Sequence, residues 1–112
     1  MKPYKRRTKA PPFVGFAKVL LRSEDWKSGL TSAEKIVYIQ LKCNYHGSDN
    51  GEIHLHYSEL KTMMAPATIS SAFKGLEKKG WIEKTKMGGL FRYYNLYKLT
   101  AKYDKLFISF NE

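Results

Sequence analysis

Apolar residues recur at helical spacing after Thr31, which opens a capping-box pattern with Glu34. The pattern predicts a helix that runs to about Asn44. Cys43 near its end is expected to be buried, as free cysteines usually are. The residues at helical spacing are Ala33, Ile36, Val37, Gln40 and Leu41, all apolar except Gln40, and Ile39 and Cys43 widen the stripe.

A second helical pattern begins at Pro66, a residue suited to the first position of a helix because it has no amide hydrogen. Gly80 is its expected C-terminal stop. Tyr57 to Met63 suits a shorter helix, and Met64-Ala65 separates the two. The sequence therefore predicts a helix-turn-helix. The buried stripe of the later helix is expected to be Ile69, Ala72, Phe73 and Leu76.

Alternating and β-prone segments predict strands on either side of this motif. Glu52 to His56 alternates, Trp81 to Lys86 follows Gly80, and Leu90 to Thr100 returns after a glycine turn at Gly88-Gly89. The expected fold is α+β and mainly α. It is a winged helix-turn-helix with three helices, a short strand and a two-stranded hairpin as the wing.

The two ends of the chain differ from the middle. Ser23 is placed to cap a short helical turn from Glu24 to Lys27. With 112 residues the chain has the length of one domain. Its first dozen residues are basic, contain no acid and include three prolines, so we expect a disordered basic arm over 1–12 and a folded domain over 13–112. Apolar residues near both ends are expected to join the core. Near the N-terminal end these are Phe13, Phe16, Val19, Leu20 and Leu21, and in the C-terminal tail they are Tyr103, Leu106, Phe107, Ile108 and Phe110.

The charge balance narrows the class of partner. Lys and Arg number 20 against 10 Asp and Glu, a formal net charge of +10. One group of cations lies in the proline-containing first dozen residues and a second lies between Lys74 and Lys98. Such an excess favours a polyanion, with nucleic acid ahead of an acidic membrane.

Several segments also resemble a known family. The stretch from Met64 to Ile82 (MAPATISSAFKGLEKKGWI) resembles the recognition helix and first wing strand of bacterial and phage winged helix-turn-helix proteins. Further segments upstream and downstream are similar to other parts of that family. They are Trp26-Lys27 with Leu30-Thr31, Val37-Tyr38, Tyr45-His46-Gly47 with Asn50-Gly51-Glu52-Ile53, and Tyr97 to Thr100. Relatives include winged domains of replication initiators and transcriptional regulators. The resemblance implies duplex DNA binding in transcription regulation or replication.

The expected DNA contacts follow from the way a recognition helix enters the major groove. This helix contains no Arg, Asn or Gln, and Ser71 stands where relatives often have arginine. We therefore expect strong phosphate binding with modest direct base readout. The candidate residues are Pro66, Ala67, Thr68, Ser70, Ser71 and Lys74 on the helix, Lys84, Lys86 and Arg92 on the hairpin, and Lys5, Arg6 and Arg7 on the arm.

Other functions remain open at this point. The scaffold could instead bind a protein partner. Alternatively, Phe91, Tyr93, Tyr94 and Tyr97 could stack on single-stranded DNA or RNA.

Other features argue against enzymes and bound groups. We expect no enzyme, cofactor or small-molecule substrate, because no catalytic or phosphate-loop motif is present. Cys43 with His46, His54 and His56 lacks a paired-cysteine knuckle, so no zinc site is expected. A lone cysteine, with no signal sequence or membrane-length apolar run, favours a cytoplasmic protein. The apolar tail could also serve a homodimer.

Overall fold

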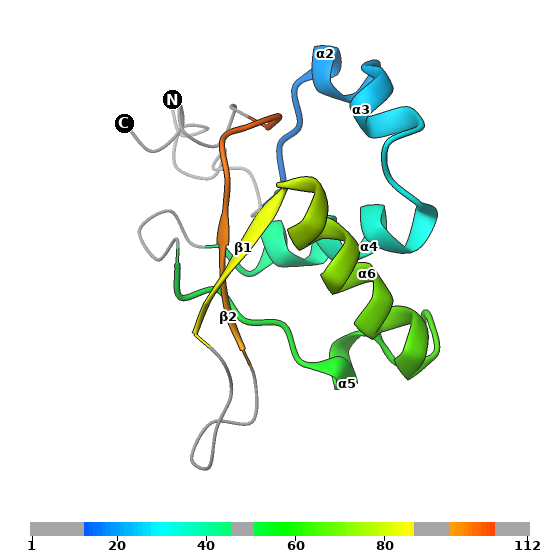
Figure 1. Cartoon of the computed structure of the whole chain (residues 1–112), viewed down its shortest axis with the longest axis vertical. Coiled ribbons are helices and arrows are strands. Elements are labelled where there is room, and N and C mark those ends of the chain that lie inside the picture. Colours follow the sequence, from blue (N-terminus) through cyan, green and yellow to red (C-terminus); the bar gives the residue numbers. More distant parts are fainter. Residues whose placement is uncertain (1–12, 46–50, 87–94, 105–112) are drawn as a thin grey trace, which may run out of the picture.

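The computed structural model describes residues 13–45, 51–86 and 95–104, which form an α+β fold (Figure 1). Five helices and a two-stranded antiparallel sheet lie within these ranges. About half of the described residues are helical, so the predicted mixed class with mainly α content is confirmed. In chain order the elements are α2 (Lys18–Leu21), α3 (Glu24–Lys27), α4 (Ser32–Cys43), α5 (Tyr57–Leu60), α6 (Pro66–Lys79), β1 (Ile82–Lys86) and β2 (Leu96–Leu99).

The two long helices begin and end where the sequence predicts. Thr31 caps α4 by accepting a hydrogen bond from the Glu34 amide at 3.1 Å, and the Glu34 carboxylate accepts one from the Thr31 amide at 2.9 Å. Pro66 occupies the first turn of α6, and Gly80 ends it with φ of +88°. That left-handed conformation favours glycine. The predicted stripe of α6 is fully buried, as are Val37 and Leu41 of α4.

Helices α4 and α6 pack against each other at Gly75. A Cβ at this position would overlap Glu34 Oε2 and lie 2.9 Å from Glu34 Cδ. The Glu34 side chain is buried and also accepts a hydrogen bond from Lys79 Nζ at 2.6 Å. One carboxylate therefore caps α4, pairs with α6 and fills the space left by the missing side chain of Gly75.

The sheet forms from β1 and β2 in antiparallel register, with Ile82 opposite Leu99 and Lys84 opposite Tyr97. The register shifts between Lys84 and Lys86, so the ladder is irregular at Thr85. The predicted strand at Glu52–His56 is reduced to one bridge, in which Ile53 exchanges two backbone hydrogen bonds with Tyr97 at 3.1 and 2.7 Å. The expected glycine turn and the return-strand residues before Asn95 lie outside the described residues.

The structure corrects several details of the sequence prediction. Helix α3, capped by Ser23, confirms the short turn predicted from Glu24 to Lys27, whereas α2 was not predicted. Helix α5 ends at Leu60 rather than Met63. Three residues expected in the core are exposed: Phe13, Val19 and Leu21. Val19 and Leu21 belong to α2, a single turn that buries only Leu20, and Phe13 lies ahead of this helix. Cys43 is exposed rather than buried: two residues beyond Leu41, it lies on the opposite side of α4.

Both ends of the described chain meet at α4 around one buried carboxylate. Asp104 Oδ2 accepts hydrogen bonds from Tyr38 Oη and from Lys42 Nζ, each at 2.7 Å. Lys42 Nζ also donates to the Gly15 carbonyl at 2.7 Å and lies 4.1 Å from the centre of the Phe16 ring. These contacts fix the segment around Gly15 and Phe16 to the core. The predicted cap of α3 is also present, since the Ser23 side chain accepts a hydrogen bond from the Trp26 amide.

The part of the tail that the structure describes packs onto the domain, as expected. Tyr103 stacks on buried Trp81 with ring centres 4.6 Å apart, next to the Asp104 network. Trp26 also contacts Trp81, with ring centres 5.9 Å apart, which makes it part of the same aromatic cluster. The rest of the tail, 105–112, lies outside the described residues.

Candidate nucleic-acid interface

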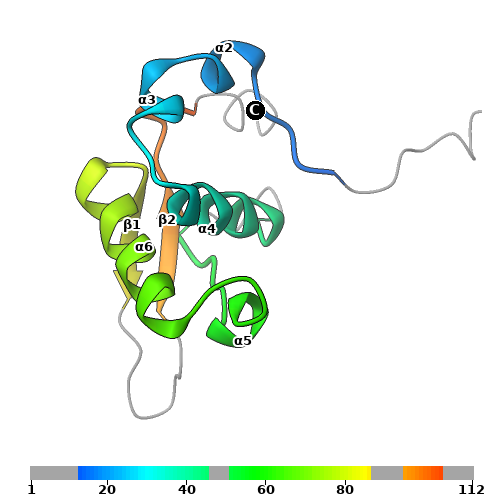
Figure 2. The ribbon, with the colours of Figure 1, turned by 90° about the vertical axis from the view of Figure 1, so that its right-hand side faces the viewer.

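Helix α6 presents one face to the core and the opposite face to solvent. Ala67, Ser71, Lys74 and Lys78 are exposed and follow one another at intervals of four, three and four residues. That spacing places them in a single row along the helix. Figure 2 shows α6 along one edge of the molecule, with α4 on its inner side. The exposed row is therefore available along the length of α6.

The row changes character along the helix. Its N-terminal half carries small neutral side chains, whereas its C-terminal half carries Lys74 and Lys78. No charged residue occurs between Lys61 and Lys74. The N-terminal end of α6 thus presents neutral groups between flanking lysines.

A stack of three aromatic rings fixes α6 between α5 and the sheet. The ring centres of Tyr57 and Phe73 are 6.2 Å apart at an interplanar angle of 3°, and those of Phe73 and Tyr97 are 5.0 Å apart at 22°. Phe73 and Tyr97 are buried, while Tyr57 at the start of α5 is 47% exposed. Because the rings come from α5, α6 and β2, the stack sets the orientation of α6 relative to the sheet.

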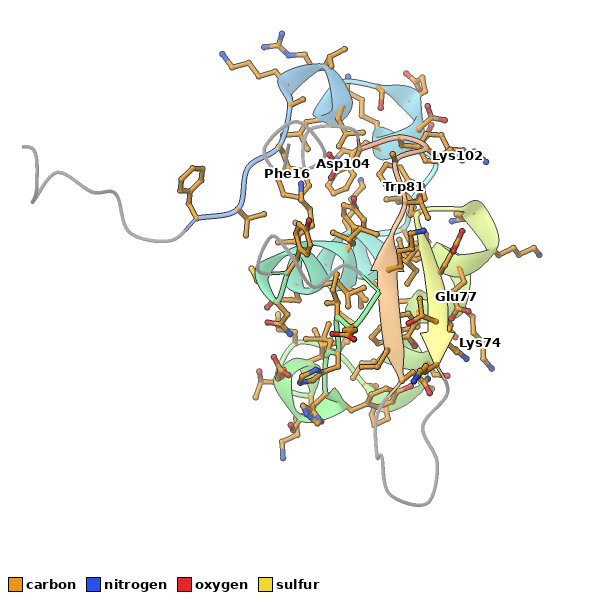
Figure 3. The ribbon with its side chains drawn as sticks, turned by 90° about the vertical axis from the view of Figure 1, so that its left-hand side faces the viewer. Phe16, Lys74, Glu77, Trp81, Lys102 and Asp104 are labelled. Carbon is orange, nitrogen blue, oxygen red and sulfur yellow. The ribbon has the colours of Figure 1, made fainter. Side chains whose placement is uncertain are left out.

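Strand β1 adds exposed cations beside α6. Lys84 and Lys86 are exposed on β1, which contacts α6 directly. Figure 3 shows Lys74 and Glu77 of α6 on the side of the helix near this strand. The lysines of α6 and β1 therefore belong to neighbouring parts of one surface.

Two acidic residues, Glu83 and Glu77, reduce the net positive charge near the lysines of α6 and β1. Glu83 pairs in register with Lys98 on the outer side of the sheet, so these exposed charges offset each other. Glu77 is partly buried close to Tyr97.

The surroundings of Tyr97 act on its pKa in both directions. Burial raises the pKa of Tyr97, the hydrogen bond from Asn95 lowers it, and the nearby Glu77 charge raises it further. Tyr97 is therefore a neutral structural ring at the base of β2.

The structure places most of the predicted contact residues on this surface. Pro66, Ala67, Thr68, Ser71 and Lys74 are exposed on α6, Ser70 is half-buried there, and Lys84 and Lys86 are exposed on β1. The predicted contacts Arg92, Lys5, Arg6 and Arg7 lie outside the described residues.

Two exposed lysines were not among the predicted contacts. Lys78 extends the exposed row of α6, and its position four residues after Lys74 was the available signal. Lys61 follows α5 immediately before the turn to α6. Both add positive charge to the surface formed by α6 and its neighbours.

A different group of charges lies far from this surface. Lys18 and Arg22 are exposed at α2, which Figure 1 shows at the opposite end of the molecule from α5. These two residues carry the same charge as the Lys84 and Lys86 pair. They provide a matched comparison for any electrostatic test of the α6–β1 surface.

Other candidate sites gain no support within the described ranges. His54 and His56 lie with ring centres 5.0 Å apart, but no three His, Cys, Asp or Glu residues there are grouped to hold a metal ion. None of the helices in the described part of the chain has the length and apolar character needed to span a membrane. The chain matches no family model, and no curated protein or solved structure is significantly similar to it.

Proposed function

We propose that this protein binds double-stranded DNA as a winged helix-turn-helix domain. In this proposal α5, the turn at 61–65 and α6 are the helix-turn-helix, and β1 with β2 forms the base of the wing. The order of the elements and the bridge between Ile53 and Tyr97 are compatible with this architecture. The main support is the exposed row of α6, which lies next to exposed lysines on β1.

The dimensions of DNA suit this surface. The major groove is about 12 Å wide and accepts one α-helix. In a helix-turn-helix the N-terminal residues of the second helix face the base edges, which here are Pro66, Ala67 and Thr68. Lys74 and Lys78 farther along α6 would then contact phosphates, with Lys84 and Lys86 on the backbone beside the groove. Such binding would serve either the regulation of transcription or replication.

Salt dependence tests the role of the lysines on β1. Each neutralised phosphate contributes about 0.9 to the slope of log affinity against log salt concentration. The double variant Lys84→Gln/Lys86→Gln is expected to lower that slope by roughly 1.8 on a duplex of mixed sequence. The control, Lys18→Gln/Arg22→Gln, removes the same charge from the far end of the molecule and is expected to leave the slope nearly unchanged.

The comparison separates a local contact from a general charge effect. Equal reductions in both variants would mean that net charge alone drives association, and an unchanged slope in the β1 variant would remove this strand from the interface. Circular dichroism of both variants controls for folding. All four substituted side chains are exposed, so neither variant is expected to lose structure.

A further inference from the structure

The corner between α5 and α6 exposes apolar groups in the middle of the basic surface. Met63 is 47% exposed, and Ala65, Pro66, Ala67 and Thr68 are all exposed after it. The lysines on either side in sequence are Lys61 and Lys74. Met63, Ala65 and Ala67 are thus exposed apolar residues close together in the sequence at this corner, and exposed apolar surface commonly marks contact sites.

The surrounding charge favours a polyanion as the molecule that covers this corner. Exposed lysines on α6 and β1 lie on the same surface. Glu59 is the exposed acid of α5, and its carboxylate accepts hydrogen bonds from the His56 amide at 3.0 Å and from Asn44 Nδ2 at 3.4 Å. A partner that fits this corner would carry negative charges to pair with the lysines. It would also carry an apolar group, between those charges, to contact the apolar residues of the corner.

We propose that this apolar corner contacts the 5-methyl groups of thymines in the major groove, so that the protein prefers thymine-rich duplex DNA. The inference rests on the proposed function. Thymine is the base that places a methyl group on the floor of the major groove, where alanine and threonine methyls make apolar contacts. The helix-turn-helix docking geometry places Ala67 and Thr68 toward these base edges.

The side chains at this end of α6 favour methyl contact over hydrogen-bonded base readout. Bidentate recognition of guanine or adenine requires Arg, Lys, Asn or Gln. None of these occurs between Lys61 and Lys74. Sequence preference would therefore come from apolar contact with thymine and from the shape of thymine-rich DNA, while the lysines supply affinity for the backbone.

Base analogues test the proposal directly. The probes are an alternating thymine–adenine duplex and the same duplex with deoxyuridine for every thymidine, which removes the methyl groups but keeps charge and base pairing. Burial of one methyl group is worth about fourfold in affinity, so two contacts predict roughly fifteenfold weaker binding to the uracil duplex. Conversely, 5-methylcytosine in a guanine–cytosine duplex is expected to strengthen binding.

Two protein variants assign the effect to the corner. Met63→Gln/Ala67→Ser is expected to reduce the ratio of thymine to uracil affinity toward one, because both changes replace exposed apolar groups with polar ones. Lys78→Gln should weaken binding to both duplexes equally and keep the ratio. Equal affinity of the wild type for both duplexes would overturn the methyl contact while leaving duplex binding intact, whereas no binding to any duplex would overturn the proposed function itself.

Discussion

Replacement of Gly75 by alanine tests how α4 and α6 are held together. Alanine normally stabilises a helix interior by up to about 1 kcal/mol relative to glycine. Here its Cβ would overlap Glu34 Oε2, which belongs to a side chain only 7% exposed. The carboxylate cannot move without loss of its hydrogen bonds from the Thr31 amide and from Lys79 Nζ.

The expected cost follows from these contacts. Loss of the cap is worth about 1 kcal/mol, and loss of the half-exposed ion pair with Lys79 at most about 1 kcal/mol. If Glu34 stays in place, the helices must separate, which typically costs about 1–3 kcal/mol. After the helix-propensity gain, Gly75→Ala is expected to lower the free energy of unfolding by about 1–2 kcal/mol. The Tm should fall by roughly 5–15 °C.

A double-mutant cycle isolates the cause. Glu34→Ala destabilises the protein by itself but opens the space beside Gly75. In that background Gly75→Ala should become neutral or stabilising by up to about 1 kcal/mol. Thermal and urea unfolding of the four proteins measure both effects. An increase in stability from Gly75→Ala in the wild-type background would refute the close approach of α4 and α6.

Three further predictions concern buried and exposed side chains. Asp104→Ala leaves Lys42 buried without its partner and should cost about 3–5 kcal/mol in urea unfolding, while Lys42→Met/Asp104→Leu should recover most of that loss. Burial and the Asp104 carboxylate raise the pKa of Tyr38, so the folded state retains a proton that the unfolded chain releases above about pH 10. Stability should therefore fall above that pH by up to about 1.4 kcal/mol per pH unit from this group, and less steeply in Tyr38→Phe. Cys43 is exposed and should react with a thiol reagent in the folded protein about as fast as after denaturation, and strong protection would contradict its exposure.

The local signals in the sequence predict the long helices well. The Thr31 capping box, the proline at the start of α6 and the glycine at its end each act within a few residues, and the structure shows each in its expected place. The buried stripe of α6 follows from the same periodicity.

Features that depend on contacts between distant residues could not be predicted in this way. The single bridge at Ile53 depends on the position of Tyr97, and the burial of Asp104 depends on Tyr38 and Lys42. Neither Glu34 nor Gly75 shows by itself that the two approach each other. At Cys43 the residue type favours burial, but the residue lies on the side of α4 opposite buried Leu41 and is exposed.

The candidate interface was predictable in part for similar reasons. Exposure of the neutral N-terminal half of α6 follows from the apolar stripe on its opposite face. The contribution of β1 depends on how the strand packs beside α6, which needs the aromatic stack of Phe73 on Tyr97. Lys78 could have been found from its position four residues after Lys74, whereas Lys61 becomes a candidate only once the exposed surface is known.

The most direct test of duplex binding is fluorescence anisotropy of a labelled duplex of mixed sequence and of its single strand, each titrated with the full chain across a range of salt concentrations. The proposed function predicts tighter binding to the duplex than to the single strand, with an affinity that falls steeply as salt increases. Tighter binding to the single strand, or no binding to either at low salt despite a net charge of +10, would contradict it.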